Sequence, residues 1–180
     1  MELVKLRRIV TGHNDAGKSV VTIDGPPGNL IERGAGGLAE IWHVGDGAIS
    51  STDDFDPASG EVILSPPAGG SKFRYFKIAP NDPDMSRAEL AAATKATFEA
   101  MGAAHERPDT TRDPRMHKTP TIDYIILLSG EVTLLLDDDQ RDLKPFDVVV
   151  QRGTNHAWVN HGSEPALLIA VLIDAEIVGG

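Results

Sequence analysis

The chain of 180 residues contains no cysteine, so neither a disulfide bond nor a thiolate nucleophile or metal ligand is available to it. Basic residues are also scarce, since 17 Lys and Arg stand against 27 Asp and Glu and the net charge is −10. This balance repels nucleic-acid phosphates and anionic membrane surfaces, and no compact basic patch offsets it. We therefore expect no nucleic acid and no membrane among its partners.

Long apolar runs are missing as well. No segment approaches the ~18 uninterrupted apolar residues of a transmembrane helix, and the first residues, MELVKLRRIVTGH, lack the apolar run of a signal peptide. The prediction is a cytoplasmic protein. The length and the 41% of hydrophobic residues suit one domain over residues 1–180, with N-terminal strands in 1–80, a helix in 84–104 and a second group of strands in 115–174.

Short strands separated by Gly- and Pro-containing turns dominate the pattern. In the first part they are predicted at Leu6–Thr11, Ser19–Asp24, Leu38–Val44, Glu61–Leu64 and Lys72–Ile78. In the second they are predicted at Thr121–Leu128, Val132–Asp137, Asp147–Gln151, Asn155–Asn160 and Ala166–Asp174. Turn signals at intervals of roughly 8–12 residues are typical of an all-β sandwich or barrel.

One helix interrupts this pattern, from about Ser86 to Met101. Ser86 and Glu89 form a capping box at its start, and Gly102 is suited to end it. Leu90 and Phe98 fall on one apolar side, so the helix is expected to pack that side on the body of the domain. It could cover the mouth of a barrel as a lid, or pack on the outside.

The segment TGHNDAGKSVV matches the phosphate-binding pattern Gly-x-x-x-x-Gly-Lys-Ser between Gly12 and Ser19. Such a loop needs a helix after it, whereas VVTIDGPPG follows, whose β-branched residues disfavour a helix and whose prolines would break one. The pattern therefore predicts a hairpin between Arg8–Thr11 and Ser19–Ile23, with no bound nucleotide.

The segment MHKTPTIDYIILLSG carries the main candidates for chemistry. In an extended chain its odd positions share one face, which is polar at His117, Thr119, Thr121 and Asp123 and apolar beyond. The even positions from Ile122 to Leu128 are large and mostly apolar, so both faces are expected to be buried. One face could fill a barrel, and the other could lie against another sheet, the N-terminal strands or a second subunit.

A second segment, RGTNHAWVN, places His156, Trp158 and Asn160 on one face of another strand. Two histidines and a carboxylate that converge in a cleft suit a divalent metal with open coordination positions. We predict His117, Asp123 and His156 as metal ligands or catalytic groups, and Thr119, Thr121 and Trp158 as residues of a substrate pocket. Asp123 could equally orient a histidine or transfer protons itself.

These two segments resemble the motifs of the cupin superfamily, in the branch called the cupin-2 conserved barrel. His117-x-Thr119, Asp123 and Gly130 follow the spacing of the first cupin motif, and Gly153-x-x-His156-x-x-x-Asn160 follows the second. The resemblance implies an all-β, double-stranded β-helix (jelly-roll) barrel, here with an N-terminal strand extension and one helix before the first motif. The sequence departs from the cupin motif at Thr119, where a histidine is usual, and at Asp123, where a glutamate is usual.

The resemblance implies a small molecule as ligand or substrate and a bound divalent ion such as Fe, Mn, Ni or Zn. One hypothesis is a metal-dependent lyase, a decarboxylase or dehydratase, that acts on a small organic acid or an aromatic or polyketide-like metabolite. The alternatives are a metal-free cupin that senses or binds a small molecule, metal-free acid–base catalysis, and a cupin dioxygenase or isomerase. The apolar even face of the His117 strand predicts a homodimer.

Overall fold

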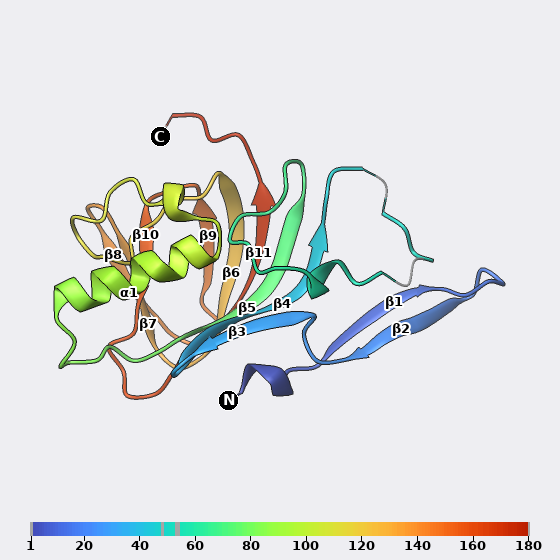
Figure 1. The fold of residues 1–180 in the computed structure, drawn as a ribbon, viewed down its shortest axis with the longest axis horizontal. Coiled ribbons are helices and arrows are strands. Elements are labelled where there is room, and N and C mark those ends of the chain that lie inside the picture. The colour runs from blue at the N-terminus through green and yellow to red at the C-terminus, as the bar shows by residue number, and fades with distance from the viewer. Residues whose placement is uncertain (1, 48, 53–54, 180) are drawn as a thin grey trace.

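The structure is a computed structural model that describes residues 2–47, 49–52 and 55–179 (Figure 1). The strands are β1 (Arg8–His13), β2 (Ser19–Gly25), β3 (Asn29–Arg33), β4 (Gly36–Val44), β5 (Ser71–Ile78), β6 (Thr121–Ser129), β7 (Val132–Leu136), β8 (Gln140–Leu143), β9 (Val148–Arg152), β10 (His156–Val159) and β11 (Ala166–Asp174). The helices are α1 (Arg87–Ala100) and the 3-10 turns η1 (Leu3–Lys5), η2 (Pro57–Ser59) and η3 (Ala104–Glu106).

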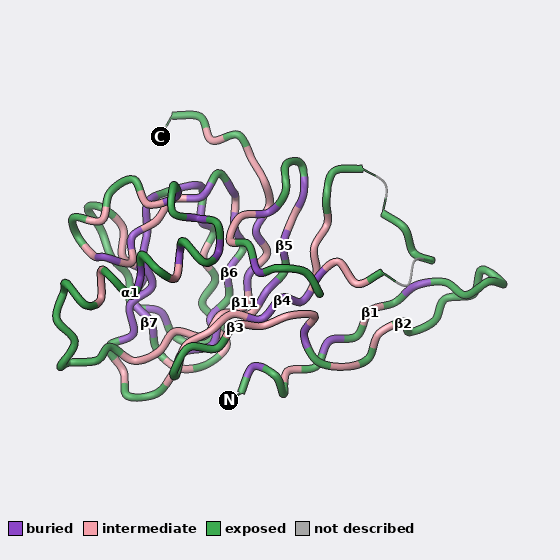
Figure 2. The backbone as a smooth tube through the Cα atoms, in the orientation of Figure 1, coloured by how far each residue is buried: buried purple, intermediate pink, exposed green. Residues whose placement is uncertain are grey.

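Two antiparallel sheets form the body of the molecule. One has six strands in the order β3-β4-β5-β11-β6-β9, and the other has three in the order β10-β7-β8. Their inner faces enclose the main hydrophobic core, to which β6, β7, β10 and β11 contribute side chains such as Leu127, Leu134, Trp158 and Leu168. The tube in Figure 2 shows this buried region on the strands of the barrel, whereas β1 and β2 are mostly exposed.

Alternating burial along β6 sets the direction of its side chains. Thr121, Asp123, Ile125 and Leu127 are buried, as predicted for the odd positions. The expectation that the even face is also buried is wrong for this chain by itself, because Tyr124 and Ile126 are exposed on the outside of the sheet.

The segment between Gly12 and Ser19 is the tip of a hairpin. Strands β1 and β2 pair antiparallel, and the chain reverses through a turn in which Gly17 has a φ of 69°. A strand rather than a helix follows Ser19, which confirms the predicted hairpin. In Figure 1 this hairpin extends away from the barrel.

The helix begins and ends as predicted. The Ser86 backbone N–H donates to the Glu89 carboxylate and the Glu89 N–H donates to the Ser86 hydroxyl, which completes the capping box. The chain leaves the helix through Gly102, whose φ of 67° is in the left-handed region that favours glycine. None of the helices among the described residues is long and apolar enough to cross a membrane.

The strand predictions need correction at three places. Residues 61–64 were predicted as a strand, but they form irregular backbone, because the carbonyl groups of Ile63 and Leu64 accept hydrogen bonds from the Arg74 side chain instead of from a neighbouring strand. Strands β3 and β8 were not predicted. Both are short and carry polar side chains, so their pairing with β4 and β7 decides their conformation.

Candidate functional site

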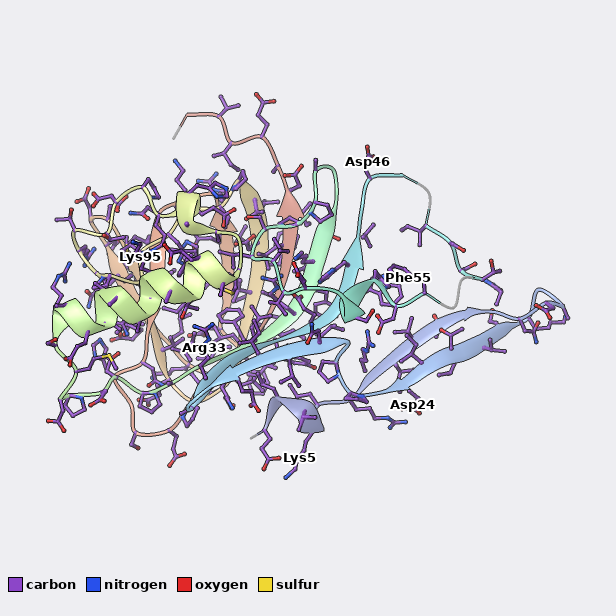
Figure 3. All side chains as sticks on the ribbon, viewed as in Figure 1. Lys5, Asp24, Arg33, Asp46, Phe55 and Lys95 are labelled. Atoms are coloured by element: carbon purple, nitrogen blue, oxygen red, sulfur yellow. The ribbon has the colours of Figure 1, made fainter. Side chains whose placement is uncertain are left out.

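A cavity of about 730 Å³ lies between the inner face of the six-stranded sheet, strand β10 and helix α1. Its lining is mostly apolar and includes Phe76 of β5, Ile125 of β6, Trp158 of β10, and Ala170 and Leu172 of β11. The helix closes one side of the cavity with Leu90, Ala93, Thr94, Thr97 and Phe98. Figure 3 labels Arg33 beside this helix, where its guanidinium donates to the Thr97 hydroxyl at the rim of the cavity.

His117 and His156 lie side by side in the wall of this cavity. Their backbones form a reciprocal pair of hydrogen bonds, N–H to C=O at 2.9 Å in both directions, so their side chains project to the same side. The ring centroids are 4.2 Å apart, and Phe98 of α1 packs 4.9 Å from the His117 ring. Two segments whose histidines are 39 residues apart in the sequence therefore present their imidazoles together.

Both rings are held in the same tautomer. His117 Nδ1 lies 3.0 Å from the Arg115 carbonyl oxygen, and His156 Nδ1 lies 2.9 Å from the Thr154 carbonyl oxygen. A carbonyl oxygen only accepts, so each Nδ1 carries the proton and each Nε2 keeps its lone pair. No hydrogen bond from the described residues reaches either Nε2, which leaves two acceptors available to a ligand.

Burial keeps these histidines neutral. It lowers the pKa of His117 to about 4, against a weaker opposing effect of the hydrogen bond to Arg115. Burial also lowers the pKa of His156 well below its ordinary value, and the neighbouring His117 lowers it further. Near neutral pH both imidazoles therefore act as proton acceptors or electron-pair donors rather than as cations.

Asp123 lines the same cavity from β6. Burial raises its pKa to about 6, while a hydrogen bond from Thr121 and the charge of Arg74 act in the opposite direction. Its Oδ1 is buried and has no hydrogen-bond partner among the described residues. A carboxyl group with a pKa near neutrality and an unpartnered oxygen is suited to accept and return a proton.

Arg74, which the sequence analysis missed, lies at the buried end of the cavity and is neutralised there. Its guanidinium donates four hydrogen bonds, two to the Glu40 carboxylate and two to the carbonyl oxygens of Ile63 and Leu64. Burial would raise the pKa of Glu40, but His43, whose Nε2 lies 3.0 Å from Glu40 Oε2, and the charges of Arg74 and Lys72 hold this pKa below its ordinary range. The alternation of Lys72, Arg74 and Phe76 places them on one face, although the sequence does not tell which face is inside.

The predicted site residues do not all reach the cavity. His117, Asp123, His156 and Trp158 line it, whereas Thr119 and Thr121 are buried beside it and their hydroxyl groups are hydrogen-bonded to each other at 2.7 Å. The substrate-pocket role of the two threonines stays a prediction. In this structure Thr121 acts on Asp123, because its hydrogen bond lowers the pKa of that carboxyl group.

The donor atoms present fit part of the predicted metal site. Two neutral imidazoles with free Nε2 lone pairs are suitable ligands for a first-row divalent ion. However, no group of three or more His, Cys, Asp or Glu side chains among the described residues is arranged to hold a metal ion, so Asp123 does not complete the set. The side chain of His105, in the turn η3 after the helix, is largely exposed and adds no third ligand to the two imidazoles.

Comparison with known proteins agrees with this architecture. Residues 105–172 match the family Cupin_2, described as a cupin domain. The chain is also 43% identical to Phomopsin biosynthesis cluster protein D of Diaporthe leptostromiformis, over 99% of this chain and 87% of that one. The chain belongs to the cupin superfamily. The predicted family and the all-β jelly-roll fold are thereby confirmed.

Two further matches cover smaller parts of the chain. The cupin-domain-containing oxidoreductase srdD of Neurospora crassa is 40% identical over 35% of this chain and 34% of that one. Among solved structures, a cupin 2 conserved barrel domain protein from Salinispora arenicola CNS-205 is 17% identical, with a TM-score of 0.37 over 58% of this chain and 64% of that one.

The raised pKa of Asp123 predicts a pH-dependent stability difference between this cupin and its Asp123→Asn variant. Because the folded protein holds this proton more tightly than the unfolded chain, the stabilisation is complete below pH 4 and is lost as the pH rises through about 6. Asparagine does not titrate. Between pH 4 and pH 7 the wild type should therefore lose on the order of 2 kcal/mol of its free energy of unfolding relative to the Asp123→Asn variant.

Urea unfolding of both metal-free proteins at the two pH values measures this difference. All other titrating groups are common to the two proteins, so their contributions cancel. An equal difference at pH 4 and pH 7 would mean that the Asp123 carboxyl is solvated in solution.

Proposed function

We propose that this cupin binds a mostly apolar small molecule of aromatic or polyketide-like type in the barrel cavity, and that His117, His156 and Asp123 perform acid–base chemistry on its polar group. The observation that carries the proposal is the cavity itself. Its volume of about 730 Å³ is typical of small-molecule sites, and its lining is mostly apolar, with the two imidazoles and the Asp123 carboxyl group among its polar groups.

The charges of the site favour a neutral ligand over an organic acid. Arg74 is the buried cation of the lining, and Glu40 and two carbonyl oxygens already take four of its N–H groups. A ligand carboxylate at the buried end would meet two unprotonated Nε2 atoms and Asp123, all of which are acceptors. A hydroxyl, an N–H or an acidic C–H would instead find an acceptor in each of them.

Acid–base roles follow from these protonation states. A neutral imidazole removes a proton through Nε2, while its Nδ1–H stays on a backbone carbonyl group and stabilises the imidazolium that forms. Asp123, with a pKa of about 6, can return a proton to the leaving group or to carbon. This combination supports a lyase such as a dehydratase, or an isomerase. A metal-free binding protein remains the alternative in which no turnover follows binding.

A cavity-filling variant tests the ligand site. Ala170 is buried on β11 and lines the cavity, so Ala170→Phe places a ring in the space that the ligand would occupy. In a screen of aromatic and polyketide-like compounds, a ligand at a hundredfold excess over its Kd should raise the Tm of the wild type by roughly 5 °C or more. The same compound should leave the Tm of Ala170→Phe unchanged.

Ala92→Phe is the matched control, because Ala92 is on the exposed side of α1 and does not line the cavity. This variant should respond to the ligand as the wild type does. A ligand that stabilises Ala170→Phe as strongly as the wild type would locate the binding site elsewhere and contradict the proposal.

A second candidate is an oxidoreductase with a divalent metal ion held by His117 and His156. The two free Nε2 atoms favour it, and three relatives that match about a third of this chain are named as cupin-domain-containing oxidoreductases. The metal would supply redox or Lewis-acid chemistry. Elemental analysis of the purified protein beside His117→Ala/His156→Ala decides: a near-stoichiometric metal that is lost in the double variant supports this candidate, and equal, trace content in both proteins contradicts it.

A further inference from the structure

The carbonyl group of Arg115 selects the tautomer of His117, because its oxygen lies 3.0 Å from His117 Nδ1 and accepts the proton there. Arg115 is in the irregular segment between η3 and β6 and belongs to none of the strand pairs in the described part of the chain. The hydrogen bonds of a sheet therefore do not fix this carbonyl group. Its position depends on side-chain contacts.

The Asp113 carboxylate accepts three hydrogen bonds from Arg115. The backbone N–H donates to Oδ1 at 2.8 Å, Nε donates to the same oxygen at 2.8 Å, and Nη2 donates to Oδ2 at 2.7 Å. A bidentate pair of this kind fixes the geometry more strictly than a single charged contact. Nη1 donates to the Asn81 side chain at 2.6 Å, so the guanidinium is held from two sides.

The residues on either side of Arg115 are anchored as well. The Met116 N–H donates to the Asp113 carbonyl oxygen at 3.1 Å, and the Met116 side chain is fully buried against β10. The ring of Pro114 restricts its φ to about −65°. The turn from Asp113 to Met116 is therefore closed, with the Arg115 carbonyl group directed at His117.

Asp113 keeps its negative charge in this turn. Burial would raise its pKa, but hydrogen bonds from the side chain and the backbone of Arg115, together with the charges of Arg115 and Arg87, hold this pKa below its ordinary value. The side chains of Asp113 and Arg115 are only 15% and 22% exposed. Water and salt therefore screen this pair less than they screen an ion pair on the surface.

The tautomer of His117 matters for the cavity. A neutral imidazole carries its proton on either nitrogen, and the hydrogen-bond partner of one nitrogen decides which. If the Arg115 carbonyl group moves away, the proton can transfer to Nε2, which then offers an N–H in place of a lone pair. Phe98 packs 4.9 Å from the His117 ring and restricts its rotation, but an apolar ring does not select a tautomer.

His156 is held by a separate arrangement and is therefore an internal reference. Its Nδ1 lies 2.9 Å from the Thr154 carbonyl oxygen, which also accepts a hydrogen bond from Gln151 Nε2 at 3.1 Å. In the described part of the chain no hydrogen bond connects Asp113 with this carbonyl group. A change at Asp113 should therefore affect His117 and leave His156 as it is.

We propose that Asp113 is a positioning residue of the candidate site. Through Arg115 it holds the backbone carbonyl group that keeps the proton of His117 on Nδ1, so that Nε2 is available to the ligand. The inference rests on the proposed function only for what Nε2 then does, since acid–base chemistry and metal binding both need this lone pair.

Long-range ¹H–¹⁵N NMR correlations of the histidine rings test the proposal on the full chain at pH 7, after a chelator has removed any bound metal. In the wild type, His117 and His156 should both carry the proton on Nδ1. In Asp113→Ala a substantial fraction of His117 should change to the Nε2–H tautomer, while His156 keeps the wild-type pattern. Asp113→Asn retains an oxygen for the Arg115 N–H and should cause a smaller change.

Asp109→Ala is the matched control. In the same segment, Asp109 also accepts the N–H of the residue two positions later, Thr111, at 2.8 Å, but it forms no hydrogen bond with Arg115 among the described residues. Its variant should keep both tautomers. A wild type with the proton of His117 on Nε2 would overturn the proposal, as would a folded Asp113→Ala in which His117 stays Nδ1–H. If Asp113→Ala does not fold, Asp113→Asn decides in the same way.

Turnover separates this inference from the proposed function. With a substrate of the cavity, Asp113→Ala should lower kcat by roughly 10–100-fold, the usual effect of removing a group that orients a reacting histidine. The change in KM should be smaller, since Asp113 does not line the cavity. If the tautomer of His117 changes but no compound binds to any form, the proposed function fails and the positioning role stands. If kcat falls while the tautomer stays, the positioning role fails and the proposed function stands.

Discussion

Replacing His156 with glutamine is expected to lower the turnover of a substrate identified in the cavity by roughly 10²–10⁴-fold, the usual contribution of a general acid or base. The His156 Nε2 is one of the two unprotonated imidazole nitrogens of the site. Glutamine fills a similar space but does not accept a proton near neutral pH. His117→Gln should have a similar effect, because the paired rings face the same part of the cavity. The double variant should be little worse than the more damaging single variant, as for groups that act together.

Steady-state kinetics of the three variants measures this prediction, with His105→Gln and His161→Gln as controls. Both control histidines are exposed, and neither lines the cavity. Their variants should keep the turnover of the wild type. Full activity in His156→Gln would contradict the prediction and show that the histidine pair only shapes the pocket. If no substrate is turned over by any form, including the wild type, the metal-free binding alternative is favoured instead.

Removing the Glu40 carboxylate is expected to cause the largest loss of stability, about 3–5 kcal/mol for Glu40→Ala. Glu40 is fully buried, its Oε1 is 2.7 Å from Arg74 Nη2, and Lys72 and His43 lie nearby. Without it, the buried guanidinium keeps only carbonyl oxygens as partners and has no counter-charge. Burial already lowers the pKa of the neighbouring Lys72 to about 8, and the charge of Arg74 lowers it further. A second cation beside the Arg74 guanidinium is therefore costly even while Glu40 is present.

Urea unfolding of Glu40→Ala, Arg74→Met and Glu40→Leu/Arg74→Met measures the interaction. The double variant should regain much of the stability lost in Glu40→Ala, because neither charge is then buried alone. Asp24→Ala removes an exposed ion pair with Arg7 on the hairpin and should change stability only slightly. If Glu40→Ala costs no more than Asp24→Ala, water reaches this network in solution and the site is more open than the structure describes.

Local patterns in the sequence predicted most of the fold. The Ser86 capping box and the hairpin between β1 and β2 depend on interactions between residues that are close in sequence. Turn residues and β-branched runs are sufficient for such elements. The predicted strand at 61–64 failed because its carbonyl groups are used by the Arg74 side chain, a contact that no local pattern records.

The candidate site divides in the same way. The sequence by itself determined which residues can do chemistry, namely His117, Asp123 and His156, because residue type and spacing identify them within the cupin motifs. Only the tertiary structure decided that the two imidazoles stand 4.2 Å apart while Thr119 and Thr121 lie behind the cavity wall. It also decided that Arg74 points inward and is neutralised by Glu40, and that the even face of β6 is left uncovered. These features depend on which strands become neighbours and which face of the sheet the helix covers, and long-range packing alone selects both.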